Sequence, residues 1–177
     1  TDIEVVDDYP SSVLAHARRQ HRWVRGDWQI LLWLFQFVPS RAGLKRNHLP
    51  AISRWKILDN LRRSLMPPAT VLLLICGWTV LPGDAWAWTA AALATLVLPA
   101  LTPVLRLLRG PRRGLSRGVF LRASIEDLQT AAARAILQLT FMANDACQRL
   151  HAITITLVRL GVTHRRLLEW ETAAASA

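Results

Sequence analysis

Apolar stretches without charge alternate with arginine-rich segments along this chain, and the alternation predicts most of its elements. The two longest apolar stretches run from Leu65 to Leu81 and from Trp86 to Leu105. Each is close to the length of a helix that crosses the ~30 Å hydrocarbon core of a bilayer. Pro82-Gly83-Asp84 between them is a turn sequence. The pattern predicts a membrane-spanning helical hairpin, kinked at Pro99 and Pro103 in its second helix.

Basic residues flank this hairpin on both sides. Arg62 and Arg63 precede the first stretch, and arginines follow the second at positions 106, 109, 112 and 113, whereas the turn carries only Asp84. Lys and Arg accumulate in short cytoplasmic segments, so both ends of the hairpin are predicted to be cytoplasmic. The tryptophans near the turn, Trp78, Trp86 and Trp88, would then form an aromatic belt at the opposite membrane surface.

The segment before the hairpin has shorter patterns. Residues 1–6 alternate weakly as a strand, and Ser11 or Ser12 is placed to cap a helix over residues 12–25. Trp28–Phe37 is apolar almost all round, but as a helix it would reach only about 15 Å, too short to span. It is either an interfacial or a buried core helix. Apolar spacing over residues 52–65 predicts an interfacial amphipathic helix.

Beyond the hairpin, residues 109–118 indicate a flexible basic loop, and Ser124 begins a capping-box-like helix start. Apolar residues recur at helical spacing from there to near Gly161, which predicts one or two long amphipathic helices. A third span over residues 131–150 is the less favoured alternative. The fold class is mainly α, an integral membrane helical hairpin with interfacial amphipathic helices. Its predicted parts are residues 1–64, the hairpin 65–108, the basic loop 109–123 and the amphipathic helical region 124–177.

Composition narrows the class of protein. The 177 residues include 22 Lys+Arg against 12 Asp+Glu, a net charge of +10, which suits nucleic acid, anionic lipid or phosphorylated substrates. A hydrophobic content of 52% and eight tryptophans favour a membrane interface over a nucleic-acid-binding module. Two cysteines without metal-ligand spacing argue against a disulfide scaffold or a zinc site. The chain begins at Thr1 in what reads as a strand already under way, so we expect an internal fragment of a larger protein.

The most informative chemistry lies in the predicted helix over residues 12–25. Arg19, Arg22 and Trp23 form a compact cationic and aromatic patch. A guanidinium offers a planar fork to phosphate oxygens or sugar hydroxyls, and an indole offers a broad face to a pyranose ring. These residues are therefore candidates for substrate binding. The alternative is an interfacial helix whose arginines face lipid phosphates.

Other candidate residues give weaker signals. Asp7-Asp8 could ligate a hard cation, or form a solvated turn before Pro10. His16 and His21 lie five residues apart and do not share a face as a ligand pair would. Asp27 is expected to cap a helix or pair with a nearby arginine. No Gly-rich phosphate loop, Ser/His/Asp set or Cys/His cluster occurs, so no catalytic residue and no metal ligand is assigned.

These patterns carry a resemblance to a known family. Arg19, Arg22 and Trp23 match, in the arginine-first form, the Gln- or Arg-x-x-Arg-Trp motif of processive inverting glycosyltransferases with a GT-A fold. Residues 14–29 and 52–64 resemble, more specifically, the bacterial cyclic β-1,2-glucan synthases. Leu167-Leu168-Glu169-Trp170 is similar to that family's passage into a phosphorylase-like C-terminal region.

The resemblance implies a multi-pass enzyme of the bacterial inner membrane that builds and cyclises β-1,2-glucan from UDP-glucose. It implies Mg²⁺ or Mn²⁺ at a carboxylate motif upstream of Thr1, together with the catalytic base, and a phosphorylase-like domain downstream of Ala177. The short N-terminal strand would be a remnant of the GT-A α/β domain. Arg19, Arg22 and Trp23 would hold the donor diphosphate and the growing glucan, and the fragment alone would be inactive. The competing hypothesis is a non-catalytic basic membrane anchor or assembly subunit. Both hypotheses include anionic lipids as partners, and neither includes nucleic acid.

Overall fold

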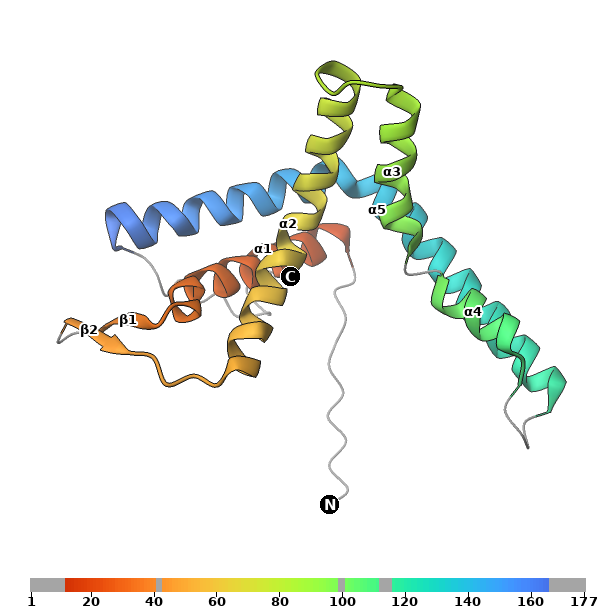
Figure 1. Ribbon diagram of the computed structural model, residues 1–177, viewed down its shortest axis with the longest axis horizontal. Helices are drawn as coiled ribbons and strands as arrows, with labels where there is room; N and C mark the ends of the chain where they lie inside the picture. Colours follow the sequence, from red (N-terminus) through yellow and green to blue (C-terminus); the bar gives the residue numbers. More distant parts are fainter. Residues whose placement is uncertain (1–11, 41–42, 99–100, 112–115, 166–177) are drawn as a thin grey trace. The chain divides into compact units, whose positions relative to one another are not determined.

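The computed structural model describes residues 12–40, 43–98, 101–111 and 116–165, and most of its regular structure is helical (Figure 1). The mainly α class is therefore confirmed, while the predicted N-terminal strand and GT-A remnant lie outside the described residues. The elements are α1 (Val13–Gln29), the 3₁₀ turn η1 (Leu31–Leu34), β1 (Phe37–Ser40), β2 (Gly43–Arg46), α2 (Ala51–Thr79), α3 (Ala85–Val97), α4 (Leu101–Arg109), α5 (Arg117–Val158) and the π-helical turn η3 (Arg159–Thr163).

The chain divides into two compact units. The first unit comprises the chain up to Pro68 and the chain from Asp145 onward, and the second comprises Ala69–Asn144. Helices α2 and α5 each contribute residues to both units. The first unit contains α1, the two strands and the candidate motif, and the second contains α3 and α4.

Helix α1 begins where the sequence predicts and extends further. The Ser12 hydroxyl accepts a hydrogen bond from the Ala15 backbone N–H at 3.1 Å, which confirms Ser12 as the N-cap. The helix continues to Gln29 instead of residue 25. Gly26 does not end it, because a single glycine costs a helix only about 1 kcal/mol.

The predicted helix over Trp28–Phe37 is wrong. The α-helix stops at Gln29, and after η1 the chain forms β1, which pairs antiparallel with β2. Phe37 lies opposite Arg46 in this hairpin, and Gly43 takes the left-handed φ of +100° that the turn requires.

Asn47 accounts for the end of helical structure here. Its buried side chain donates from Nδ2 to the carbonyl oxygens of Trp33 at 2.6 Å and Phe35 at 2.9 Å. Those carbonyls are thereby satisfied without the hydrogen bonds that a continuing helix would give them. A polar residue twelve or more positions away thus overrides the apolar pattern.

Helix α2 joins two elements that the pattern predicts separately. The interfacial helix over residues 52–65 and the first stretch of the hairpin form one continuous helix, and Pro67 and Pro68 lie inside it. Pro67 has no N–H, which leaves the carbonyl of Arg63 without its helical partner. Arg149 of α5 donates from Nη1 to that carbonyl oxygen at 3.1 Å. A side chain from another helix thus compensates for the proline.

The predicted turn after α2 is confirmed. Gly83 has a φ of +100°, and the Asp84 carboxylate accepts a hydrogen bond from the Trp86 backbone N–H at 3.0 Å, which caps α3. The chain then runs back alongside the end of α2 (Figure 1).

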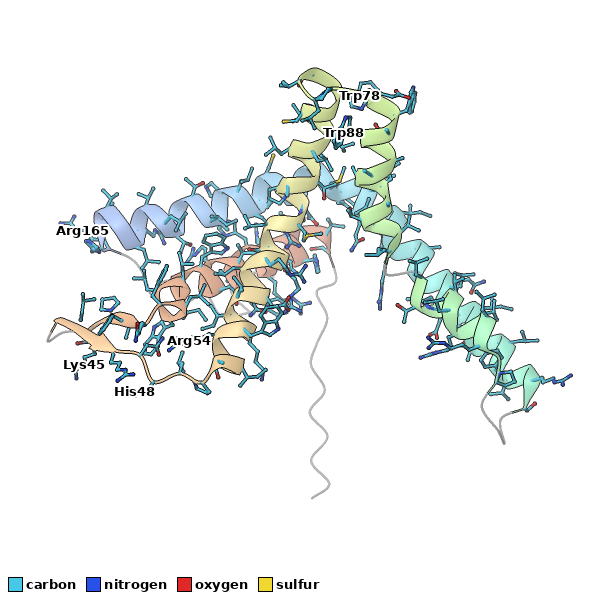
Figure 2. All side chains as sticks on the ribbon, viewed as in Figure 1. Lys45, His48, Arg54, Trp78, Trp88 and Arg165 are labelled. Atoms are coloured by element: carbon cyan, nitrogen blue, oxygen red, sulfur yellow. The ribbon has the colours of Figure 1, made fainter. Side chains whose placement is uncertain are left out.

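Tryptophans and a glycine hold the two arms of this turn together. Trp78 and Trp86 meet edge to face with ring centroids 6.1 Å apart, and the Trp88 indole donates to the Pro82 carbonyl at 3.1 Å. A Cβ on Gly77 would lie 2.5 Å from the Cβ of Trp88. Figure 2 shows Trp78 and Trp88 at this end of the unit. Trp78, Trp86 and Trp88 therefore cluster around the turn.

The second apolar stretch is not one helix. It is divided into α3 and α4, whose axes differ by 65°. No individual helix within the described ranges combines the length and apolar content needed to cross a membrane; α3 and α4 meet that requirement as a bent pair.

The sequence predicts one or two long helices in this region, and the structure has one, α5. It begins at Arg117, so the predicted start at Ser124 is wrong and part of the predicted basic loop is helical. Ser124 is instead a buried residue inside the helix. The helix passes into η3 and ends at His164, which has a left-handed φ of 48°.

Candidate functional site

The candidate motif occupies one side of α1. At about 100° per residue, Arg19, Arg22 and Trp23 fall within roughly a third of the helix circumference. His21 and Val24 point to the opposite side. The helix therefore separates a motif face, defined as Arg19, Arg22 and Trp23, from a packing face.

Arg19 and Trp23 contact each other directly on the motif face. The Arg19 Cζ lies 5.0 Å from the centroid of the Trp23 ring, within the range of a cation–π interaction. Trp23 keeps 56% of its surface exposed despite this contact. The Arg19 Nε is buried without a hydrogen-bond partner in residues 12–40, 43–98, 101–111 and 116–165. The pair thus presents a large aromatic surface with a guanidinium fixed beside it.

The packing face contacts the C-terminal half of α5. Val24 forms a buried cluster with Ala152 and Ile153, and Trp28 packs against it. Ala152, the smallest residue of this cluster, is fully buried.

Two histidines add a polar contact to this helix pair. His21 Nε2 lies 2.9 Å from His151 Nδ1, and the ring centroids are 5.2 Å apart. Burial lowers the pKa of His21 from its ordinary value of 6.5, and the neighbouring His151 and Arg25 lower it further. His21 is therefore neutral at pH 7 and can complete a hydrogen bond between two imidazoles.

Helix α1 is also tied to α2. The Trp28 indole Nε1 donates to the Ser64 hydroxyl at 2.8 Å, and Asn60 Nδ2 donates to Asp27 Oδ1 at 3.0 Å. Burial raises the pKa of Asp27 above 3.8, while the bond from Asn60 and the charge of Arg63 oppose that rise. The packing contacts and these bonds fix the rotation of α1 about its own axis, and with it the direction of the motif face.

Other sequence candidates do not join this site. Asp7 and Asp8 lie outside the described residues, and His16 is exposed on α1. Across the described ranges, no three His, Cys, Asp or Glu side chains come together as a metal site would require. Arg19, Arg22 and Trp23 remain the candidate residues for substrate binding.

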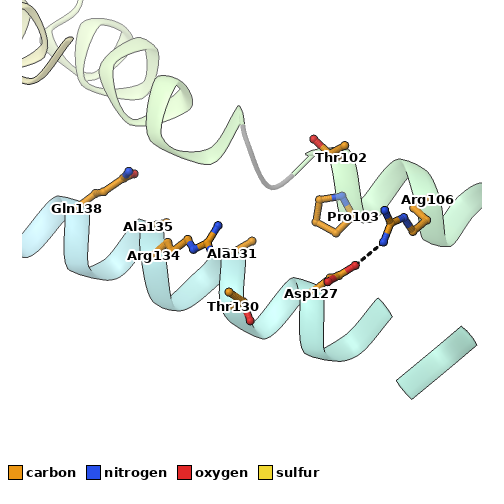
Figure 3. Close-up of a pocket in the computed structure, with 9 residues that line it drawn as sticks. All are labelled: Thr102, Pro103, Arg106, Asp127, Thr130, Ala131, Arg134, Ala135 and Gln138. Atoms are coloured by element: carbon orange, nitrogen blue, oxygen red, sulfur yellow. Dashed lines mark hydrogen bonds and ion pairs between the residues drawn. The ribbon is translucent and has the colours of Figure 1, made fainter. Parts of the chain in front are cut away.

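The second unit contains a separate cavity of about 380 Å³ between α4 and α5 (Figure 3). An ion pair between Arg106 and Asp127, with Nη1 and Oδ2 2.7 Å apart, lies at one side of it. Arg134 and Gln138 of α5 also line it. None of the motif residues contributes to this cavity.

Sequence reasoning missed the residues that hold the motif in place. His151 and Asn60 are 130 and 33 residues distant from their partners on α1, and neither stands in a recognisable motif. One signal was available for His21, because it falls three residues before Val24 on the apolar side of the helix.

Comparison with known proteins bears on this geometry. The chain is 36% identical to the cyclic β-(1,2)-glucan synthase NdvB of Rhizobium meliloti (strain 1021) over 178 aligned residues. The resemblance to the cyclic β-1,2-glucan synthases is confirmed. The match covers 98% of this chain and 6% of the length of the Rhizobium synthase, so the motif face and its supporting helices all lie within the similar region. No family model matches the chain, and no solved structure matches it.

Proposed function

We propose that this chain is part of a membrane glucosyltransferase that polymerises glucose from UDP-glucose into cyclic β-1,2-glucan. The motif face of α1 would contribute the binding site for the donor diphosphate and the acceptor sugar. The observation that carries this proposal is the contact between Arg19 and the exposed Trp23, on a helix within the region similar to the Rhizobium synthase.

The chemistry of the motif face fits the two tasks. Transfer of glucose leaves a nucleotide diphosphate, whose negative charge grows as the glycosidic bond to it breaks. A guanidinium from Arg19 or Arg22 stabilises this charge through paired N–H donors. The Trp23 ring stacks on a sugar of the acceptor and holds its hydroxyl toward the donor. Trp23 is exposed on this face, whereas Arg19 and Arg22 are half-buried beside it.

Substitutions in the full-length product of the gene test the assignment. Arg22→Ala and Trp23→Ala should each abolish most glucan synthesis while the protein still inserts in the membrane. Loss of one phosphate-binding arginine removes about 2–4 kcal/mol of transition-state stabilisation, which is roughly a 30- to 1,000-fold fall in rate. Arg122→Ala is the matched control, since Arg122 forms an exposed pair with Glu126 on α5. Full activity of both motif variants would refute the proposal.

The same experiment separates the enzyme from a non-catalytic membrane anchor. An anchor that binds lipid headgroups needs positive charge but not a planar fork, so Arg22→Lys would leave it intact. A diphosphate site loses its paired donors in that variant. We expect Arg22→Lys to impair synthesis nearly as much as Arg22→Ala.

We further propose that the end of α2 and the bent pair α3–α4 form a hairpin in the bacterial inner membrane, with both flanks cytoplasmic. Moving an arginine into the membrane costs roughly 2.5–3.5 kcal/mol on insertion scales. The flanks carry several arginines and the turn carries none. A cytoplasmic motif face is where a nucleotide sugar would be available.

Cysteine labelling tests this topology. In a full-length protein whose other cysteines, Cys76 and Cys147 among them, are replaced, Asp84→Cys should react with an impermeant thiol reagent from outside the inner membrane. Ser116→Cys should react only after permeabilisation. The reverse pattern would place the motif on the wrong side of the membrane.

Mg²⁺ or Mn²⁺ and two further domains belong to the proposed enzyme. The metal would neutralise the donor diphosphate at carboxylates outside this chain, and glycosyltransferase and phosphorylase-like domains would precede and follow it in the same polypeptide. UDP-glucose, the growing glucan and anionic lipids are the proposed partners. The arginines of the motif face would act on the diphosphate alongside the metal.

A further inference from the structure

The contact between His21 and His151 links the motif to a distant part of the chain. We propose that His151 is a positioning residue for the motif face, acting through His21, and that it keeps Arg22 and Trp23 aimed at the substrate. This inference rests on the proposed function. His21 occupies the third position of the Arg-x-x-Arg-Trp motif, and its Nε2 lies 2.9 Å from His151 Nδ1 on α5.

Helix geometry explains how a contact on the packing face controls the motif face. The neighbouring contacts of Val24 with Ala152 and Ile153 are apolar and have no directional preference. The imidazole pair is directional, because a ring nitrogen must point its N–H at the lone pair of the other ring. A rotation of α1 by one residue position would turn His21 by about 100° and move Trp23 by the same angle. The histidine pair therefore selects one rotation of α1 on α5.

The number of protons bound to the two imidazoles determines the pH range over which the His21–His151 hydrogen bond persists. One extra proton on the pair keeps the hydrogen bond, because the charged ring donates to the lone pair of the neutral ring. Two extra protons leave no lone pair between Nε2 and Nδ1, and the two positive rings repel. Besides burial, two neighbouring groups of the described residues lower the pKa of His21, namely His151 from α5 and Arg25 from α1. Only protonation of both rings therefore breaks the contact, and because the pKa of His21 is lowered from 6.5, this happens only as the pH falls below 6.5.

Two substitutions of His151 in the full-length protein separate positioning from general stability. His151→Asn places an amide near the position of Nδ1, so it keeps a hydrogen-bonding group that does not titrate. His151→Leu removes the bond and keeps the bulk. We expect His151→Leu to raise the KM for the glucan acceptor roughly fivefold, the value of one hydrogen bond, with a smaller change in kcat. His16→Asn, on the exposed part of the same helix, is the control.

The pH profile of glucan synthesis is the measurement that a purely structural role of His151 would not change. We expect synthesis by the unsubstituted protein to fall as pH drops below about 6.5, and the acid limb of His151→Asn to shift to lower pH. An acid limb identical in the two proteins, or an unchanged KM in His151→Leu, would overturn the proposal. If His151→Leu does not fold, the His151→Asn profile decides alone.

Hydrogen exchange separates this proposal from the proposed function. Amide protection of Val13–Gln29, corrected for the intrinsic pH dependence of exchange, should weaken below pH 6.5 in the unsubstituted protein but not in His151→Asn. If Arg22→Ala and Trp23→Ala are fully active while this protection change occurs, the proposed function fails and the histidine contact stands. If protection is the same in both proteins, the histidine contact does not position α1.

Discussion

The two units of this chain hold their helices together by different means. In the first unit, side-chain hydrogen bonds connect α1, α2 and α5 across 33 to 130 residues of sequence, as between Asn60 and Asp27. In the second unit, the C-terminal end of α2 contacts α3 where Gly77 packs against Trp88. At the adjacent turn, the indoles of Trp78 and Trp88 donate hydrogen bonds to residues only 11 and 6 positions away in sequence. Between the helices that carry the motif face, directional polar bonds add to the apolar contact at Val24, whereas α2 and α3 of the second unit meet mainly through a glycine and aromatic rings.

This difference matches the tasks that we propose for the two units. A binding face must point in one direction, and directional bonds distinguish one helix rotation from its neighbours. Helices surrounded by lipid gain little from apolar contact with each other, so close packing at small residues stabilises them instead. Changing one kind of contact should therefore affect mainly the unit that depends on it.

The largest effect is expected at Gly77. A Cβ there would lie 2.5 Å from Trp88 Cβ, an atom that cannot rotate away. Gly77→Ala should therefore destabilise the second unit by about 1–3 kcal/mol, as overpacking does. Hydrogen exchange of α3 and the end of α2 measures this loss.

Gly26→Ala is the matched control in the first unit. Nothing lies within 4 Å of a Cβ at Gly26. The same change should stabilise α1 by up to about 1 kcal/mol, because alanine is the better helix former. Equal effects at the two glycines would show that close packing does not distinguish the units.

Replacing one tryptophan in each unit compares the strength of a hydrogen bond in the first unit with that of one in the second. Trp28 donates to the buried Ser64, whereas Trp78 donates to Thr89 at the exposed turn, both at 2.8 Å. Trp28→Phe should cost about 1–1.5 kcal/mol and Trp78→Phe about 0.5, since water replaces only the exposed bond. Thermal unfolding of the purified protein, with exchange to assign the loss to a unit, gives both values. A greater loss from Trp78→Phe would reverse the comparison.

Local signals predicted the helical parts of both units well. The Ser12 cap, the turn at Gly83 and the long helix α5 all follow from neighbouring residues, which is why periodicity and turn chemistry suffice for them. Two of the failures share a cause. Asn47 ends helical structure before β1, and Arg149 allows α2 to continue past Pro67, and both act from a distance in sequence.

The candidate site also combines residues that local sequence identifies with residues that only the structure reveals. Arg19, Arg22 and Trp23 share a face because they are neighbours on one helix, so the sequence alone is enough to group them. The residues that aim this face, such as His151 and Ser64, come from other helices. Their pairing depends on how three helices pack, and no spacing along the chain encodes it.

The proline in α2 offers a test of one long-range bond in the first unit. Arg149→Leu leaves the Arg63 carbonyl without the donor that replaces the missing N–H of Pro67, and should cost about 1 kcal/mol. Pro67→Ala restores the N–H. In the Pro67→Ala background, the cost of Arg149→Leu should fall by about half or more, a coupling that a double-mutant cycle measures by urea unfolding. Strict additivity would mean that Arg149 does not compensate for the proline.

The smallest effect is a pH dependence that originates at Asp27. Burial raises the pKa of this carboxyl above 3.8, so the folded state disfavours its charged form. Its favourable contribution to stability is complete below pH 3.8 and is lost as the pH rises through the raised pKa. Asp27→Asn stays neutral and can still accept the bond from Asn60. The difference in unfolding free energy, variant minus unsubstituted protein, should therefore increase as pH rises from about 4 to 7.

Asp27→Ala removes the acceptor as well as the charge, so it should be less stable than Asp27→Asn at every pH. Urea unfolding across this range measures both, and a difference that shrinks with rising pH would show that the attraction of Arg63 for the carboxylate outweighs its burial.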